Sequence, residues 1–192
     1  MRRKGNKKPV APLEPGQEED TLTVGGAASH SILSERDVIH FLLDHIESVA
    51  DVVTKSLEQL EIHIPCGGAK QSTLVSITTS QTVREGFRKM QQLNVSSVAV
   101  VDEKEGVLVG NLSVSDLRDI TAETIQTVDN TVRDFMGGQF PAPLTADTSE
   151  TLAEVMRKTV DAKKQRIYIV DSSGKPLRVV THSHMLQALL TS

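Results

Sequence analysis

One short pattern of residues occurs three times in this chain of 192 residues. Residues 32–39, 111–118 and 179–186 each run from apolar residues through a hydroxyl residue to an acid, or its replacement, three positions later, and then return to apolar residues. This order is typical of a β-strand that turns directly into a helix. Because an internal repeat constrains a fold more tightly than a single motif does, the chain is predicted to contain repeated structural units.

The repeat extends beyond this pattern. Residues 98–102 (Val-Ala-Val-Val-Asp) match residues 167–171 (Ile-Tyr-Ile-Val-Asp), about 69 positions later, whereas Asp116 and His184 are separated by about 68 positions. The difference fits a single insertion in a hairpin turn, which reads Glu-Lys-Glu-Gly in the earlier copy and Ser-Ser-Gly in the later one. Two units of one kind therefore fill most of the chain.

Composition argues against several classes of protein. A net charge of −4 argues against general nucleic-acid binding, and an aromatic content of 3% without Trp leaves few platforms for stacking bases. No apolar run reaches the roughly 20 residues of a membrane helix. The lone Cys66 excludes an internal disulfide and suits a reducing compartment. We therefore expect a cytoplasmic protein, which can also enter the nucleus, with no nucleic-acid or membrane partner.

The first 66 residues are predicted to form two parts. Residues 1–28 read as a disordered tail, because prolines interrupt any periodicity and a basic cluster is followed by acids. That cluster is either a solvated arm or a nuclear-localisation or phosphate-binding patch. In residues 29–66, apolar residues at steps of three or four predict a helix from Ser34 to Leu60, with Ser34 and Asp37 as its capping box.

Two repeats then follow, each in the order strand, helix, strand, strand, helix. In the first repeat (residues 71–125) we expect strands at 74–77, 98–101 and 107–112 and helices that begin near Thr82 and at Ser115. In the second repeat (residues 131–192) we expect a weak strand at 142–144, strands at 167–170 and 177–181, and helices around 152–159 and 183–190. Since each repeat has few apolar faces, the two are expected to pack against each other.

This order of elements, with residues 113–116 (Ser-Val-Ser-Asp) and the connector 132–136 (Val-Arg-Asp-Phe-Met), resembles a tandem pair of CBS domains. The resemblance covers residues 74–190 and implies an α/β (α+β) fold in which two β-α-β-β-α domains form a pseudo-two-fold pair. Within that family the chain is most similar to the gamma subunits of the AMP-activated protein kinase, through residues 165–171, residues 187–189 and the partial copy at Ile32. Gamma subunits carry four such domains, so residues 29–66 are interpreted as the remnant of a preceding one.

The acid of the repeated pattern has a physical rationale as a nucleotide ligand. A carboxylate in the first turn of a helix offers two acceptor oxygens to the two hydroxyls of a ribose, and a helix N-terminus favours anions. Asp116 is therefore a candidate ribose ligand, and Ser113, with Ser115 beside it, can donate to a phosphate or to the acid. The alternative is that Asp116 only stabilises its helix, by about 0.3–1 kcal/mol.

The resemblance implies further binding residues. In the family the acid holds the ribose, and backbone around the first strand contacts the base, which here gives Ser76, Ile77, Thr78 and Thr79. A basic residue before the central strand of gamma-type domains corresponds to Arg166, with Lys164 beside it, although the two are equally well explained as a solvated pair. Thr181 is the corresponding hydroxyl residue of the second repeat.

The second repeat departs from the pattern of the family. His184 occupies the position of the acid, and Arg178 replaces the usual glycine before the strand. A neutral imidazole cannot accept hydrogen bonds from both ribose hydroxyls. We therefore expect this second site to be lost or altered. Asp37 has the repeated pattern without the rest of its domain, so a site there would be open on one side.

These patterns lead to two hypotheses of function. The first is a non-catalytic regulatory module, without cofactor or metal, that binds one AMP, ADP or ATP per chain and tunes a protein kinase as a gamma-type subunit. The second is an interaction or dimerisation scaffold with degenerate nucleotide sites. An enzyme is least supported, since no paired acid and base, nucleophile or zinc spacing is visible.

The helix of residues 34–60 also carries a prediction about assembly. Its apolar residues spread beyond a narrow stripe, and the tail before it has no strands that would cover them. An exposed apolar face of this kind marks an interface. We therefore expect a homodimer, or a complex with a second CBS protein or with catalytic or scaffold subunits of a kinase, with contacts near Leu42, Ile46, Val49 and Val53.

Overall fold

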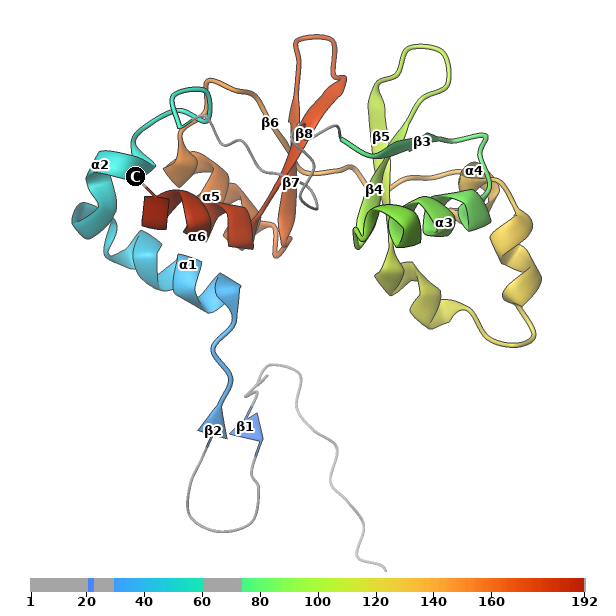
Figure 1. The fold of residues 1–192 in the computed structure, drawn as a ribbon, viewed down its shortest axis with the longest axis horizontal. Helices are drawn as coiled ribbons and strands as arrows, with labels where there is room; N and C mark the ends of the chain where they lie inside the picture. Colours follow the sequence, from blue (N-terminus) through green and yellow to red (C-terminus); the bar gives the residue numbers. More distant parts are fainter. Residues whose placement is uncertain (1–20, 23–29, 61–73, 192) are drawn as a thin grey trace, which may run out of the picture. The chain divides into compact units, whose positions relative to one another are not determined.

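The computed structural model describes residues 21–22, 30–60 and 74–191 (Figure 1). The chain divides into two parts, residues 1–34 and residues 35–192. In the first part, β1 (Thr21–Leu22) pairs antiparallel with β2 (His30–Ser31). The rest of the tail predicted for residues 1–28 lies outside the described residues. Both repeats belong to the second part.

The first repeat is a three-stranded sheet with the order β3-β4-β5. β3 (Ser76–Thr78) runs parallel to β4 (Ser97–Val101), and α3 (Val83–Leu93) connects them. β5 (Leu108–Ser113) returns antiparallel to β4. Two 3-10 helices, η3 (Val114–Asp119) and η4 (Ile125–Asp129), and the short α4 (Val132–Phe135) follow.

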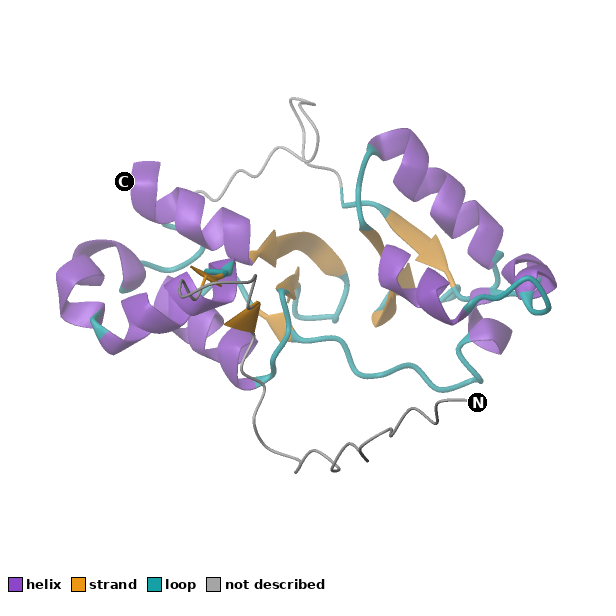
Figure 2. Cartoon of the chain, turned by 90° about the horizontal axis from the view of Figure 1, so that it is seen from below, coloured by secondary structure: helices purple, strands orange, loops and turns teal. Residues whose placement is uncertain are grey.

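The second repeat has the same order, with the sheet β6-β7-β8. β6 (Thr145–Ala146) runs parallel to β7 (Arg166–Val170), α5 (Leu152–Asp161) connects them, and β8 (Pro176–Thr181) lies antiparallel to β7. α6 (His182–Thr191) completes the repeat. In both repeats the helices cover one face of the sheet (Figure 2). The predicted α/β fold of two β-α-β-β-α domains is confirmed.

Matching local interactions explain why both repeats fold alike. Thr82 and Glu85 form a capping box at the start of α3, and Thr151 and Glu154 form the same box at α5, each with the Glu side chain 2.8 Å from the backbone nitrogen of the Thr. Such boxes satisfy two backbone donors that a helix start would otherwise leave unpaired. After each helix the chain turns through a residue with a left-handed backbone, Asn94 and Lys163.

Two of the expected helices differ from prediction. Residues 35–60, the N-terminal segment, are not one helix but α1 (Glu35–Asp44), η1 (Ile46–Val49) and α2 (Ala50–Val53). The break between α1 and η1 lies at His45, whose backbone (φ −117°, ψ 37°) is not helical. The expected helix at Ser115 is the 3-10 helix η3, which ends where Ile120 takes an extended backbone.

The N-terminal segment packs on the second repeat. Ile39, Val53 and Leu57 are fully buried in one core with residues of α5, β7 and α6. The backbone of Leu57 donates to the carbonyl of Glu150 at 3.0 Å, and Leu152 donates to Lys55 at 3.1 Å. The first repeat is covered in the same way by its own connector: Val132 donates to Gln81 at 2.8 Å and Val83 donates to Asn130 at 3.1 Å.

This packing bears on the surface from which a homodimer was predicted, while the homodimer itself stays a prediction. Val53 is buried, and Leu42, Ile46 and Val49 are partly buried against the core of the second repeat. The apolar face that was expected to need a second subunit is therefore partly covered within the chain.

Candidate functional site

Two pockets lie where the two repeats meet, and each combines the end of one repeat with the beginning of the other. The aspartate pocket contains Asp116 from the first repeat and residues 141–144 and 163–166 from the second, and has a volume of about 310 Å³. The histidine pocket contains His184 from the second repeat and residues 74–75 and 94–97 from the first, and has a volume of about 260 Å³. The two pockets occupy equivalent positions, with the roles of the first and second repeats exchanged.

Asp116 is held in the lining of its pocket by the turn from β5 into η3. Its Oδ2 accepts a hydrogen bond from the backbone nitrogen of Ser113 at 2.7 Å, and the Ser113 hydroxyl accepts from the backbone of Ser115 at 3.2 Å. The two serine hydroxyls also bond to each other. Asp116 therefore stabilises the start of its helix, which was the alternative to a role in ligand binding. Its Oδ1 makes no hydrogen bond to the described residues, so an acceptor remains for a ligand.

The second repeat contributes cations to the same pocket. Lys163, Lys164 and Arg166 line the aspartate pocket, the two lysines exposed and the arginine half-buried on β7. The left-handed backbone of Lys163, with a φ of 51°, ends α5 and leads into this stretch. Met136 and residues 141–144 add apolar side chains to the lining of the same pocket. One pocket therefore offers an acceptor, cations and apolar side chains.

The predicted site residues separate into three groups. Asp116, Ser113, Ser115, Lys164 and Arg166 come together in the aspartate pocket. Thr181 lies in the histidine pocket instead, together with Arg166. Neither pocket is lined by the predicted residues around β3, which are Ser76, Ile77, Thr78 and Thr79. Two of these residues, Ile77 and Thr79, are buried.

The base-contact prediction took the first strand from the same repeat as the acid, whereas each pocket takes the residues before the first strand of the other repeat. The base-contact prediction stays untested, and the pocket lining adds residues that were not predicted: residues 141–144, Lys163 and Tyr168. The sequence did hold a signal for them, because residues 142–144 align with the start of the first repeat and Lys163 aligns with Asn94.

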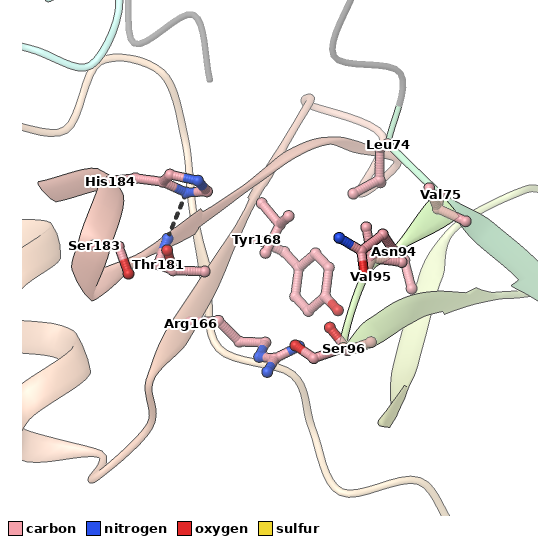
Figure 3. Close-up of a pocket in the computed structure, with 13 residues that line it drawn as sticks. Leu74, Val75, Asn94, Val95, Ser96, Arg166, Tyr168, Thr181, Ser183 and His184 are labelled. Carbon is pink, nitrogen blue, oxygen red and sulfur yellow. Dashed lines mark hydrogen bonds between the residues drawn. The ribbon is translucent and has the colours of Figure 1, made fainter. Parts of the chain in front are cut away.

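In the histidine pocket, His184 occupies the place of Asp116 (Figure 3). The backbone nitrogen of Thr181 donates to Nδ1 of His184 at 3.2 Å, just as Ser113 donates to Asp116. Because Nδ1 accepts, the ring proton lies on Nε2 and the imidazole is neutral. Burial lowers the pKa of His184, against the opposing effect of Glu35. His184 therefore presents a donor where Asp116 presents an acceptor.

Tyr168 and Arg166 stand between the two pockets and line both. The Tyr168 hydroxyl donates to the side-chain oxygen of Asn111 on β5, and the ring packs with Ala99 and Leu108 of the first repeat. Burial raises the pKa of Tyr168 to about 12, so the hydroxyl keeps its proton at neutral pH. This residue fixes the second repeat against the first at the common wall.

No group of three or more His, Cys, Asp or Glu residues in the described ranges is placed to hold a metal ion. Among those same ranges, no helix combines the length and the apolar character needed to cross a membrane.

Sequence comparison places these observations among known proteins. The model of the CBS domain family matches residues 69–123 and 132–191. Protein SDS23 of Eremothecium gossypii is 29% identical over 160 residues, which are 72% of this chain and 32% of that protein. Protein SDS24 of Saccharomyces cerevisiae is 30% identical over 158 residues, 72% of this chain and 30% of that protein. The chain thus spans about a third of the length of the curated relatives it matches.

Solved structures share the fold. The CBS domain of a bacterial CNNM/CorC family Mg²⁺ transporter in complex with ATP has a TM-score of 0.59 at 19% identity, covering 76% of this chain and 94% of that one. CBSX2 in complex with AMP has 0.54 at 22%, covering 71% and 96%. A Methanocaldococcus jannaschii protein, proposed as an archaeal homologue of gamma-AMPK, has 0.58 at 19%, covering 83% and 54%.

Proposed function

The chain belongs to the CBS domain family, and from that premise we propose that its aspartate pocket binds one adenine nucleotide and that occupancy of the pocket regulates a protein partner. One observation carries this proposal. Asp116, three cations and apolar side chains, brought from both repeats, line a single pocket of about 310 Å³. Those are the three chemistries that a nucleotide requires.

Each part of the nucleotide has a counterpart in the pocket. The free Oδ1 of Asp116 accepts from a ribose hydroxyl, and the second lone pair of Oδ2 accepts from the other. Arg166, Lys163 and Lys164 bind the phosphates, for which a guanidinium gives paired hydrogen bonds and a lysine a point charge. Residues 141–144 pack against the base with apolar surface and backbone groups. The complexes of two structural neighbours with ATP and AMP support this choice of ligand.

A regulatory output follows from where the pocket lies. Because the ligand contacts both repeats, binding favours the arrangement in which the two repeats hold their present positions. A partner that binds across both repeats then senses occupancy. We propose a protein kinase complex as that partner, on the likeness to gamma-type subunits, and no chemical reaction of the nucleotide. Steady hydrolysis of ATP by the purified chain would contradict this last point.

A scaffold without ligand is the competing function, and one observation favours it. Oδ2 of Asp116 already serves the helix start through Ser113, so the acid has a role without a nucleotide. Thermal unfolding separates the two functions, since a ligand that binds only the folded state must stabilise it as its concentration passes the Kd. A scaffold would show no shift of the Tm with AMP, ADP or ATP.

Calorimetry with AMP, ADP and ATP tests the site itself. Asp116→Asn keeps an oxygen that can accept from the Ser113 backbone but removes the carboxylate, and should weaken binding by about tenfold or more, because charge-assisted hydrogen bonds are lost. Asp161→Asn, an exposed acid at the end of α5, is the matched control and should bind like the wild type. No binding by the wild type, or equal binding by Asp116→Asn, would refute the proposal.

A further inference from the structure

We propose that the two pockets compete for a single guanidinium, that of Arg166, so that an anion bound in the histidine pocket weakens nucleotide binding in the aspartate pocket. The inference rests on the proposed function, since it concerns the regulation of the same nucleotide site. It assigns to the histidine pocket a ligand of its own and a negative coupling to its counterpart.

The position of Arg166 supports the competition. Arg166 and Tyr168 lie two residues apart on β7, so their side chains share one face of the strand, and both line both pockets. Tyr168 is fixed by its bond to Asn111. Arg166 is half-buried, and its side chain makes no hydrogen bond or ion pair with the described residues. Its guanidinium is therefore free to turn toward a ligand on either side of the wall.

The distribution of charge makes the competition unequal. The aspartate pocket also has Lys163 and Lys164, whereas Asn94 and Val95 occupy the corresponding positions of the histidine pocket. Among the residues that line the histidine pocket, Arg166 is the one with a permanent positive charge. An anion there must use Arg166, and a nucleotide in the aspartate pocket then loses one of three cations.

The lining of the histidine pocket defines the class of its ligand. No carboxylate lines it, so it lacks the acceptor that a ribose diol needs. It offers instead the Nε2 proton of neutral His184 and the hydroxyls of Ser96 and Ser97, beside apolar residues such as Leu74. The hydroxyl of Ser183, which also lines the pocket, donates to Glu35 at 2.6 Å. This chemistry fits a small ligand with one anionic group, a carboxylate or a phosphate monoester, rather than a second nucleoside.

A covalently placed anion tests the coupling without knowledge of the natural ligand. Ser96 is exposed and lines only the histidine pocket, to which Arg166 also contributes (Figure 3). In a Cys66→Ser background, Ser96→Cys is labelled with 2-sulfonatoethyl methanethiosulfonate, which attaches a sulfonate, or with methyl methanethiosulfonate, which attaches a neutral methylthio group. Mass spectrometry checks the labelling, and thermal unfolding checks the fold.

The Kd for AMP is then measured by calorimetry on both adducts. The sulfonate adduct should bind AMP about tenfold more weakly than the methyl adduct, the size expected for one hydrogen bond between charged groups. In an Arg166→Gln background the difference should disappear. Ser183→Cys provides a second attachment point in the same pocket, and Gln92→Cys, exposed on α3 and outside both pockets, is the matched control.

Two results would overturn the inference while leaving the proposed function intact. The first is equal affinity of the sulfonate and methyl adducts for AMP at both attachment points. The second is a difference in affinity that persists with Arg166→Gln, because it would show direct repulsion between the two anions. Absence of AMP binding to the unlabelled protein would overturn the inference together with the proposed function.

Discussion

Truncation of Leu57 should destabilise the second repeat, although Leu57 precedes the first repeat in sequence. Leu57 is 1% exposed and lies in the core that contains Leu152, Val155 and Met156. Leu57→Ala removes three carbons, worth about 0.8 kcal/mol each in transfer free energy, or about 2.4 kcal/mol. A cavity that the core does not fill adds to this cost, so the free energy of unfolding should fall by about 3–4 kcal/mol.

Urea denaturation followed by circular dichroism measures this loss. Val132→Ala, at the matching position on the first repeat, should also destabilise, by less because Val loses fewer carbons. Phe41→Ala is the control, since Phe41 is 59% exposed, and should change stability by about 0.5 kcal/mol or less. A loss of less than about 1 kcal/mol for Leu57→Ala would refute the docking of residues 35–60 on the second repeat, as a cavity in a real core costs more.

Three further outcomes are expected. Because burial lowers the pKa of His182 below its ordinary 6.5, the unfolded state takes up more protons as the pH falls through about 6.5, and the free energy of unfolding should decrease with acidification; His182→Leu should remove part of that decrease between about pH 7.5 and 5.5 in urea titrations. Tyr168→Phe leaves the Asn111 side chain without its partner and should lower the free energy of unfolding by about 1–2 kcal/mol in the same assay. This loss should not depend on pH below about 9, because the Tyr168 hydroxyl keeps its proton there. Gly86→Ala places a methyl group 2.6 Å from Cδ2 of buried Leu112, and the resulting overpacking should lower the Tm through a loss of about 1–3 kcal/mol, as calorimetry would measure.

The sequence was informative wherever the signal was local or repeated. The helix that begins near Thr82 and the matched strands follow from residue type and spacing, and the order of elements follows from the repeat. The break near Ile46 was not visible, since apolar steps of three or four suit an α-helix and a chain of short helical turns alike. Helix boundaries depend on packing with distant residues, which periodicity does not record.

The candidate site was predictable in part for the same reason. Asp116 and Ser113 sit on one turn, so their joint position follows from local sequence. The residues that face them come from the other repeat, and only the pairing of the two domains determines which stretch of chain that is. The segment before each repeat carries a further repeated signal. Val53 and Leu57 pack on the second repeat in the same way that Val128 and Val132 pack on the first, and both pairs are buried.

The order of synthesis gives the docked N-terminal segment a further consequence. Residues 35–60 leave the ribosome before either sheet, yet the surface that covers Ile39, Val53 and Leu57 belongs to α5, β7 and α6. At 5–20 residues per second, the roughly 130 residues between Leu57 and the end of α6 take about 7–26 s to translate. During that interval the apolar side chains of the segment are without their final cover, and the nascent chain offers a binding surface to chaperones until α6 has been made.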